Sequence, residues 1–542
     1  MLYFSLKNKF KKIKAWHLIL LFFIINILFL TNFPFIHSDE AWLSGLSRKI
    51  MENSNLASTE SFFDLLPRNP HALKIFFHLL QIIFIKFWGY KIFTFRLISL
   101  LAGTLALYIF YKIVFLITKS KSLSLGALLI LAADIHFIYS SHLARQEIIL
   151  VFIFLTAFYY FLKNIVKIRN ENTNTQYSQS KSSIEKNIYL GLILGTAIGF
   201  HPNAFIIALA FIIIYSWDLV FNKKSTLKDY LSFGITLALS ALLFVYLSFQ
   251  FDPNFIDNYS SYGAQLGVLD SFLIKLENFK GFYQKLFYRV SGTYYIPPIK
   301  FQLIFFAGLI IGSLIKLFNK KDKVNKYLFL SFLAINLGFL IIGRYNQNSI
   351  IFIFPISYLI FINLIKDYDF KISSVLIIIL LLILSLTSYI TIAKDSHYNY
   401  QIYLEQIGEF VPQDSKVLAN LNTDYYFDNG KLFDYRNLNY LEENNISFAE
   451  YIAKNKIEYI IYPEEMDFIY NTRPSWNILY GNLYPYYSDM NKFLKKETEL
   501  LKTFTNSTYA IRIVSEIGKK KWSIKIYKVK NSEATAVSQK VD

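Results

Sequence analysis

Two adjacent carboxylates, Asp39 and Glu40, follow the first long apolar run of the chain, residues 16–35. That run is long enough to cross a bilayer, which takes roughly 20 apolar residues. A lysine-rich segment precedes it, and such positive charge marks the cytoplasmic side of a membrane. The pair is therefore expected at the outer membrane face, where a carboxylate can deprotonate the hydroxyl or amine of a substrate. A solvated helix end is the alternative interpretation.

Two later clusters bring cations to the same face. Arg145 and Glu147 open an apolar helix, and they form either a structural ion pair or part of a site, since a carboxylate is favoured near a helix N-terminus. Arg344 and Tyr345 stand in a short turn between two apolar runs. An arginine there can snorkel to the interface, or it can clamp a lipid phosphate with two parallel hydrogen bonds. We predict that Arg145 and Arg344 hold a phosphate.

The composition places these groups in a helical membrane protein. Of 542 residues, 54% are hydrophobic and the mean hydropathy is +0.35, so the apolar runs indicate a multi-span bundle rather than a soluble core. Lysines in short loops explain the net charge of +18, and no nucleic-acid partner is expected. The lack of cysteine excludes disulfides and thiol catalysis. The scattered histidines predict no metal site and identify no cofactor; they are His37, His71, His78 and His201.

The elements that must position these groups follow from the loop charges. Counting from the basic loops predicts about eleven crossings, with the N-terminus inside and the C-terminus outside. The segment 72–90 contains charged residues, and Asp39 and Arg96 are both expected outside, so this segment is predicted to be an interfacial or re-entrant helix. The predicted crossings lie at 16–35, 93–117, 122–140, 143–162, 188–200, 203–221, 230–250, 300–318, 327–342, 347–365 and 372–393.

The chain divides into a membrane module, residues 1–393, and a tail, residues 394–542, that is more polar and has no spanning run. Alternating strand and helix patterns in the tail predict a small α/β domain outside the membrane. The outer face would then also collect the loops 36–71 and 251–299 and the turn 139–145. The strand patterns lie at 417–421, 457–462 and 522–527, and the helix pattern lies at 448–455.

A series of short motifs follows the acidic pair. They are Arg68-Asn69-Pro70-His71, Trp88-Gly89-Tyr90, Arg96-Leu97, Ile138-Tyr139-Ser140-Ser141, Ala144-Arg145, Gly199-Phe200-His201-Pro202, and Arg344-Tyr345 with Pro355. In order and membrane side, they resemble the GT-C glycosyltransferases of the protein O-mannosyltransferase and aminoarabinose transferase type, a group like glycosyltransferase family 39. The resemblance covers roughly residues 10–393.

This resemblance implies an enzyme that moves a sugar from a polyprenyl-phosphate donor to an acceptor on the extracytoplasmic face, with inversion. The protein is then expected in the cell membrane, specifically a bacterial inner membrane. It would have a GT-C-like fold surrounded by membrane lipids. Asp39 takes the position of the general base, and Glu40 and Arg48 match residues that position the substrate. Glu147 matches a second acidic residue of the family, and it is preferred over Asp134 because it lies beyond the inferred membrane edge.

The resemblance also implies a set of substrate-binding residues. Arg145 matches the arginine of the later turn, and His201, Arg344 and Tyr345 belong to the matching motifs. Some relatives carry a lysine before the proline of the first loop that touches the lipid phosphate. This chain departs from that pattern, because Arg68 precedes Asn69-Pro70.

The chemical requirements of sugar transfer agree with this assignment. A sugar phosphate ester is already a good leaving group, so transfer needs a carboxylate base and cations for the phosphate rather than a strong acid. Two alternatives remain. A secondary transporter would show repeat symmetry, and a lipid-linked oligosaccharide polymerase or ligase would use cations of a large outer loop, here Lys285 and Arg289. The acceptor class stays open among a protein, a glycolipid and a wall polymer.

Overall fold

The apolar runs form a bundle of long helices, because a backbone in lipid must satisfy its own hydrogen bonds. The computed structural model describes residues 14–166, 179–222, 226–318 and 322–530. Within these residues, eight helical segments are long and apolar enough to cross a membrane. They are α5 (Ile92–Thr118), α8 with η1 (Glu147–Ile165), α10 with η2 (Ala204–Phe221), α11 (Leu227–Phe251), α14 (Lys300–Leu317), α15 (Lys323–Ile342), η3 with α16 (Gln347–Ile365) and α17 (Phe370–Asp395).

Three further predicted crossings take a different form. The run 122–140 is broken into α6 (Lys121–Ala132) and α7 (Ile135–His142), which are bent by 64°. The break has a local cause, because the Asp134 side chain caps α7 by accepting hydrogen bonds from the backbone N–H groups of His136 and Phe137. The predicted crossing 188–200 lies at the end of α9 (Gln179–Ile198), which packs against α11.

The first apolar run is helical over a shorter stretch than expected. Helix α2 (Ala15–Ile27) has 13 residues, and turns follow it where the sequence predicted a span to residue 35. The guanidinium of Arg96 donates hydrogen bonds to the carbonyl oxygens of Leu30 (3.0 Å) and Pro34 (2.8 Å). These bonds satisfy backbone groups that a continued helix would have used itself.

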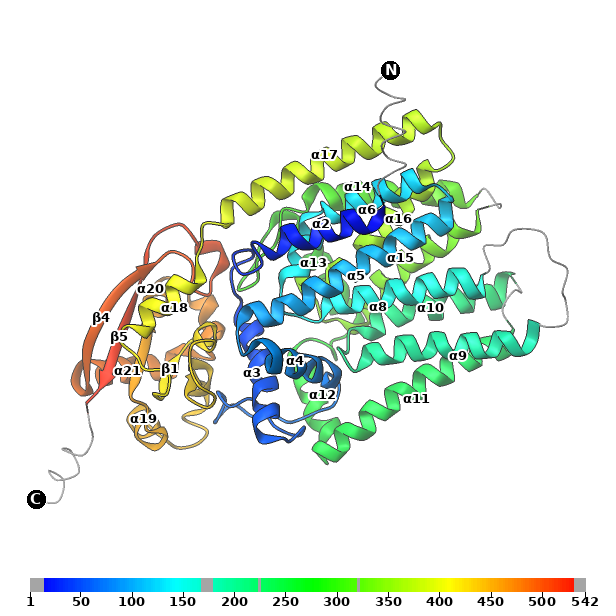
Figure 1. The fold of residues 1–542 in the computed structure, drawn as a ribbon. Helices are drawn as coiled ribbons and strands as arrows, with labels where there is room; N and C mark the ends of the chain where they lie inside the picture. The colour runs from blue at the N-terminus through cyan, green and yellow to red at the C-terminus, as the bar shows by residue number, and fades with distance from the viewer. Residues whose placement is uncertain (1–13, 167–178, 223–225, 319–321, 531–542) are drawn as a thin grey trace, which may run out of the picture.

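Several shorter helices gather at one end of the bundle (Figure 1). Helix α3 (Ser38–Asn53) carries the acidic pair, and α4 (Ile75–Trp88) packs against it. With 14 residues, α4 is shorter than a membrane crossing requires, which agrees with the interfacial or re-entrant helix predicted for 72–90. Helices α12 (Phe255–Gln265) and α13 (Phe272–Tyr288) belong to the long loop between α11 and α14.

The same end of the bundle carries the C-terminal α/β domain (Figure 1). Its sheet has the strand order β2-β1-β3-β5-β4, with β2, β1 and β3 parallel and β5 antiparallel to both of its neighbours. The strands are β1 (Val417–Ala419), β2 (Leu432–Asp434), β3 (Tyr459–Pro463), β4 (Thr498–Asn506) and β5 (Trp522–Val529). The helices are α18 (Tyr400–Gly408), α19 (Phe448–Asn455), α20 (Glu465–Thr472) and α21 (Leu483–Glu497), with short turns η4 (Leu421–Thr423), η5 (Tyr435–Tyr440), η6 (Pro474–Tyr480) and η7 (Val514–Glu516).

The α/β class predicted for the tail is confirmed. The predicted strands at 417–421, 457–462 and 522–527 correspond to β1, β3 and β5, and the predicted helix 448–455 is α19. Strands β2 and β4 were not predicted. Strand β2 has only three residues, and β4 is exposed along most of its length, so neither has a strong apolar pattern.

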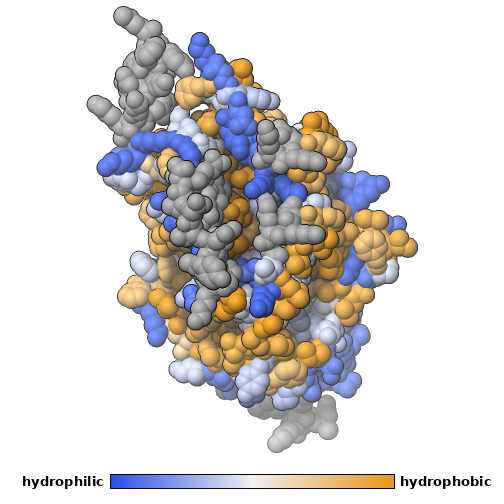
Figure 2. Space-filling view, turned by 90° about the vertical axis from the view of Figure 1, so that its right-hand side faces the viewer, coloured by the Kyte–Doolittle hydropathy of each residue, from blue (hydrophilic) through white to orange (hydrophobic). Residues whose placement is uncertain are grey.

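The opposite end of the bundle is lysine-rich. Figure 2 looks onto this end and shows hydrophilic residues among the hydrophobic residues of the helix flanks. Here Lys316 lies 3.0 Å and Lys366 lies 3.3 Å from Asp322, which joins the ends of α14, α15 and α16. The Asp39 end and the lysine-rich end thus lie at opposite ends of the bundle.

Candidate active site

Asp39 lies in the first turn of α3, at the end of the bundle that faces the C-terminal domain. His37 caps this helix, because its Nδ1 accepts a hydrogen bond from the backbone N–H of Asp39 (3.0 Å). Asp39 Oδ2 accepts hydrogen bonds from Arg145 Nη1 (2.5 Å) and from the hydroxyl of Tyr294. Its side chain keeps 26% of its surface exposed and lines a cavity. Asp39 is therefore held at one oxygen and accessible from the cavity.

The surroundings of Asp39 stabilise its carboxylate form. Burial by itself raises the pKa of Asp39, but His37, Arg145 and the hydrogen bond from Tyr294 outweigh it and hold the pKa below its ordinary value. Burial also lowers the pKa of His37, to about 4, so His37 is uncharged at neutral pH. At neutral pH, Asp39 is thus an ionised hydrogen-bond acceptor beside a neutral imidazole.

Arg145 connects the two predicted carboxylates. It donates hydrogen bonds to Glu147 Oε1 (3.1 Å), to the Tyr294 hydroxyl (2.7 Å) and to Asp39. Glu147 is 3% exposed and is not among the residues that line the cavity. The geometry therefore gives Glu147 a position from which it orients Arg145, and it places Arg145 between Glu147 and the cavity.

Glu40 lies on the other side of α3, inside the protein. Its two carboxylate oxygens accept hydrogen bonds from Arg96 Nη2 (2.7 Å) and Nε (2.9 Å), and both side chains are fully buried. Glu40 is not among the residues that line the cavity. This geometry favours a positioning role for Glu40, by which it fixes the start of α3 against α5.

Cations dominate the walls of the Asp39 cavity. Arg68, Lys74, Arg145 and Arg344 all line it, with Asp39 and Glu60 as the facing carboxylates. Within the described residues, the side chains of Lys74 and Arg344 form no hydrogen bond or ion pair, so both remain available to a ligand. The remaining lining residues are Trp42, Leu43, Leu46, Ile50, Leu56, Ser58, Thr59, Asn69, Pro70, His71, Ile75, His78, Gln146, His201 and Tyr262.

The charge of Lys74 is sensitive to this crowding. Burial lowers the pKa of Lys74, and repulsion by Arg344, Arg68 and Arg145 lowers it further, to about 7. Burial, together with Lys74, Arg344 and Arg145, also lowers the pKa of His201 well below its ordinary value, so His201 stays neutral. The cavity therefore combines fixed positive charge with one lysine that titrates near neutrality.

Two predicted substrate-binding residues lie outside the cavity. Arg48 donates hydrogen bonds to Asp424 Oδ1 (3.0 Å) and to the carbonyl oxygen of Phe427 (2.8 Å), both in the C-terminal domain. Tyr345 donates its hydroxyl hydrogen bond to the carbonyl oxygen of Lys275 (2.6 Å). Neither residue is among those that line the cavity, whereas Arg68, Arg145, His201 and Arg344 do line it.

Sequence reasoning missed three residues of the site. Lys74 was counted only as a polar residue of the segment 72–90. Tyr294 lies in a long loop whose path no local pattern reveals. Glu60 accepts a hydrogen bond from the indole N–H of Trp42 (2.5 Å) and lies 3.5 Å from Arg68. Its place in the first outer loop, between Asp39 and Arg68, was the one available signal.

Across the described stretches of the chain, no cluster of three or more His, Cys, Asp or Glu side chains is arranged to hold a metal ion.

The sequence and the fold of this chain were compared with those of known proteins. Residues 74–258 match the family model described as dolichyl-phosphate-mannose-protein mannosyltransferase. The fold resembles ArnT from Cupriavidus metallidurans bound to undecaprenyl phosphate, with 12% identity, a TM-score of 0.54, and coverage of 83% of this chain and 95% of that one. It also resembles the apo oligosaccharyltransferase of Archaeoglobus fulgidus, with 12% identity, a TM-score of 0.50, and coverage of 85% and 71%. No curated protein sequence matches this chain.

The GT-C resemblance expected from the sequence is confirmed by these matches. At such low identities the structural matches establish the fold, and the family match adds a sequence relationship over residues 74–258. The chain therefore has a GT-C membrane fold with a small C-terminal α/β domain.

The buried Glu40–Arg96 pair gives the first prediction. We expect Glu40→Gln to lower the free energy of unfolding by about 3–5 kcal/mol, because it leaves the buried Arg96 charge unpaired. Thermal unfolding of the purified protein in detergent measures this loss. Glu52→Gln, an exposed change on the same helix, is the matched control and should have little effect. Equal melting temperatures for the two variants would contradict the structural role of Glu40.

Proposed function

We propose that this chain is a membrane glycosyltransferase that moves a sugar from a polyprenyl-phosphate donor to an acceptor on the extracytoplasmic side. One observation supports this most directly. A single cavity at one end of the bundle joins an ionised carboxylate, Asp39, with four cationic side chains. An anionic phosphate and an acceptor hydroxyl or amine are the two groups that such a cavity would hold together.

The donor phosphate would bind to Arg68, Lys74, Arg145 and Arg344. Arginine suits this role because its planar guanidinium makes two parallel hydrogen bonds to phosphate. The crystal structure of ArnT contains bound undecaprenyl phosphate. A lipid carrier of this kind fits a cavity at the end of a membrane bundle. The prenyl chain would lie in the bilayer beside the helices while the sugar faces Asp39.

In the proposed step, the acceptor oxygen or nitrogen attacks the anomeric carbon of the sugar. A new bond forms there, and the bond from that carbon to the phosphate oxygen breaks, so its electron pair leaves with the polyprenyl phosphate. The acceptor proton passes to Asp39. Attack opposite the leaving phosphate inverts the anomeric configuration. Cations around the phosphate stabilise the charge that develops on the leaving group.

A carboxylate with a low pKa is adequate for this step. In glycosyl transfer the sugar carbon becomes cationic early, as in oxocarbenium-like transition states. The acceptor proton becomes acidic once its oxygen or nitrogen has begun to bond to that carbon, so a weak base can remove it late. Arg145 and Tyr294 occupy Oδ2 of Asp39, which leaves Oδ1 to face the acceptor.

The orientation in the membrane follows from the charge distribution. Lysines such as Lys316 and Lys366 lie at the end of the bundle opposite Asp39, and positive charge favours the cytoplasmic side. We therefore assign the N-terminus to the cytoplasm and the C-terminal domain, with the Asp39 cavity, to the extracytoplasmic side. Neither Lys285 nor Arg289 lines the Asp39 cavity, so nothing in this site favours a polymerase that uses these cations.

The role of Asp39 as base gives the second prediction. We expect Asp39→Asn to reduce kcat by about 10²–10⁴-fold, because loss of a general base typically has an effect of this size. Release of polyprenyl phosphate from a defined donor in proteoliposomes measures it. Asp257→Asn, an exposed change on α12 at the same end of the bundle, is the control. A variant that keeps more than about a tenth of wild-type activity would exclude Asp39 as the base.

The cation cluster gives the third prediction, which compares variants of two neighbouring residues. Arg344 lines the cavity and Tyr345 does not. We expect Arg344→Ala to raise the donor KM about tenfold or more, since a hydrogen bond to a charged group contributes about 1.5–3 kcal/mol. Arg344→Lys should recover part of this loss. Tyr345→Phe should leave the donor KM unchanged, and an increase equal to that of Arg344→Ala would contradict the phosphate site.

The pKa of Lys74 gives the fourth prediction. A phosphate prefers the protonated lysine, which predominates below the pKa of about 7. The donor KM should therefore rise as the pH increases from 6 to 9, by about tenfold from the titration of one group. The donor is a phosphodiester and does not titrate in this range. Lys74→Arg, which stays charged, should flatten the profile; a profile with the same slope in this variant would assign the titration to another group.

A further inference from the structure

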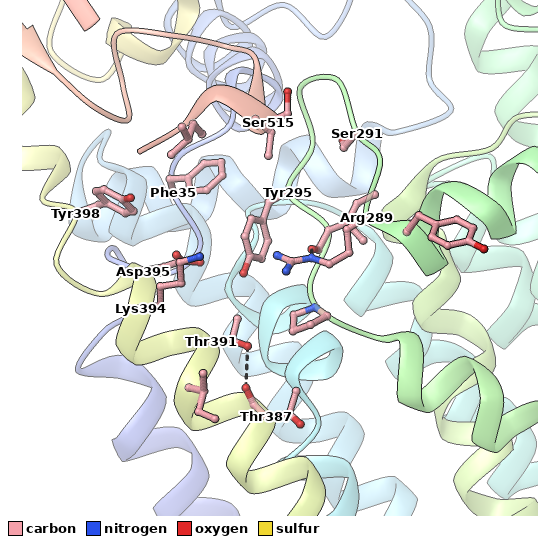
Figure 3. Close-up of a pocket in the computed structure, with 16 residues that line it drawn as sticks. Phe35, Arg289, Ser291, Tyr295, Thr387, Thr391, Lys394, Asp395, Tyr398 and Ser515 are labelled. Carbon is pink, nitrogen blue, oxygen red and sulfur yellow. Dashed lines mark hydrogen bonds between the residues drawn. The ribbon is translucent and has the colours of Figure 1, made fainter. Parts of the chain in front are cut away.

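A second and larger cavity is lined by Tyr295, the neighbour of the Tyr294 that binds Asp39 (Figure 3). Its volume is about 710 Å³, and it shares no lining residue with the Asp39 cavity. Its walls come from the end of α17, from the segment between α13 and α14, and from the region of η7 in the C-terminal domain. The proposed reaction leaves this space without a role.

The cavity lies at the edge of the membrane-spanning bundle. Thr387, Ile390 and Thr391 line it from the last turns of α17, which is a predicted span. The surface beside it is apolar and exposed, with Ile390 at 57% and Tyr288 at 68% exposure. Exposed apolar residues on a spanning helix face lipid chains. One wall of the cavity is therefore continuous with a surface that contacts the acyl chains of the bilayer.

Two cations stand inside this space. The Arg289 side chain reaches into the cavity towards Tyr295, and Lys394 lies beside Asp395 (Figure 3). Arg289 uses Nε for a hydrogen bond to the carbonyl oxygen of Ile296 (3.1 Å). Among the described residues, its two Nη atoms and Lys394 Nζ form no hydrogen bond or ion pair. The Arg289 guanidinium lies 6.0 Å from the centre of the Tyr295 ring, and its two Nη groups and Lys394 Nζ still have hydrogens to donate to a ligand anion.

One carboxylate, Asp395, faces the cations. Tyr295 and Asp395 are joined by a side-chain hydrogen bond, and Asp395 is 8% exposed. With two cations and one carboxylate, the lining has a net positive charge. The buried hydroxyl of Ser291 makes no hydrogen bond within the described residues and adds a further polar group to the same wall.

Two residues that are adjacent in the chain, Tyr294 and Tyr295, link Asp39 to the second cavity. Tyr294 binds Asp39, and Tyr295 lines the second cavity. The Tyr294 ring stacks on His37 with ring centroids 4.2 Å apart, and the Tyr295 ring packs edge-on against Phe35 at 5.3 Å. A molecule held against Tyr295 would therefore press on the segment that holds Asp39.

We infer that this cavity binds an amphiphile with a phosphate head group, drawn from the same leaflet as the donor. The phosphate contacts Arg289 and Lys394, and the acyl chains lie along the exposed apolar surface of α17 and the end of α13. The amphiphile is either the acceptor of the sugar or a bulk phospholipid. Only the first alternative rests on the proposed function. Both sources have the same phosphate chemistry.

Binding can be tested without catalysis. The purified protein is titrated with phosphatidylglycerol and, separately, with diacylglycerol, and lipid adducts are counted by native mass spectrometry. We expect saturable binding of phosphatidylglycerol and none of the phosphate-free lipid. The double variant Arg289→Gln/Lys394→Gln should weaken phosphatidylglycerol binding about tenfold or more.

A matched control removes the same charge nearby. Lys285 and Lys300 are exposed on α13 and α14 and do not line the cavity. The double variant Lys285→Gln/Lys300→Gln should bind phosphatidylglycerol as the wild type does. Equal losses in the two double variants, or unchanged binding in Arg289→Gln/Lys394→Gln, would overturn the inference.

A turnover experiment distinguishes the two sources. Phosphatidylglycerol added to phosphatidylcholine vesicles should compete with the acceptor and slow transfer if the cavity is the acceptor site. It should accelerate transfer if the cavity is a phospholipid site, and either effect should disappear in Arg289→Gln/Lys394→Gln. If no donor supports transfer, the proposed function fails, while the binding titration still decides on the cavity.

Discussion

The buried ion pair between Glu40 and Arg96 determines where the candidate base stands. Both side chains are fully buried, and the same guanidinium also holds two carbonyl oxygens of the turn after α2. One arginine of α5 thus ends α2, directs the chain into α3 and fixes the rotation of its first turn. Asp39 is the neighbour of Glu40, so it must point away from this pair, towards Arg145. The pair is costly to break, because a single partner left behind would be an unpaired buried charge.

The Asp39 cavity presents the opposite electrostatic situation, because its charges are only partly compensated. Four cations face two carboxylates, and Asp39 is already bound to Arg145. Burial, and after it repulsion by the neighbouring arginines, lowers the pKa of Lys74. Such repulsion grows as the charges approach one another and as the surrounding dielectric falls. A bound phosphate would offset this repulsion, so the arrangement suits the anionic donor that we propose.

The sequence was a good guide to the fold class and to part of the site. Hydropathy and loop charge predicted most spans, because both act locally along the chain. Asp39, Arg145 and Arg344 could be predicted to lie together, since each follows or precedes a span on one side. Arg48 could not be separated from them, because its partner Asp424 is far away in the sequence. The missed Tyr294 has the same cause, since only the folded loop brings it to Asp39.

The C-terminal domain supports the Asp39 cavity from behind: none of its described residues lines the cavity, but two of them contact α3. Its Asp424 holds Arg48 of α3, and the Arg436 guanidinium lies 4.5 Å from the ring of Trp42, which lines the Asp39 cavity. Near η7, the same domain also lines the second cavity. The domain therefore contacts both α3, which carries Asp39, and the second cavity. The contacts of Arg48 and Trp42 tie the position of α3 to this domain, and the proposed base Asp39 lies in the first turn of that helix.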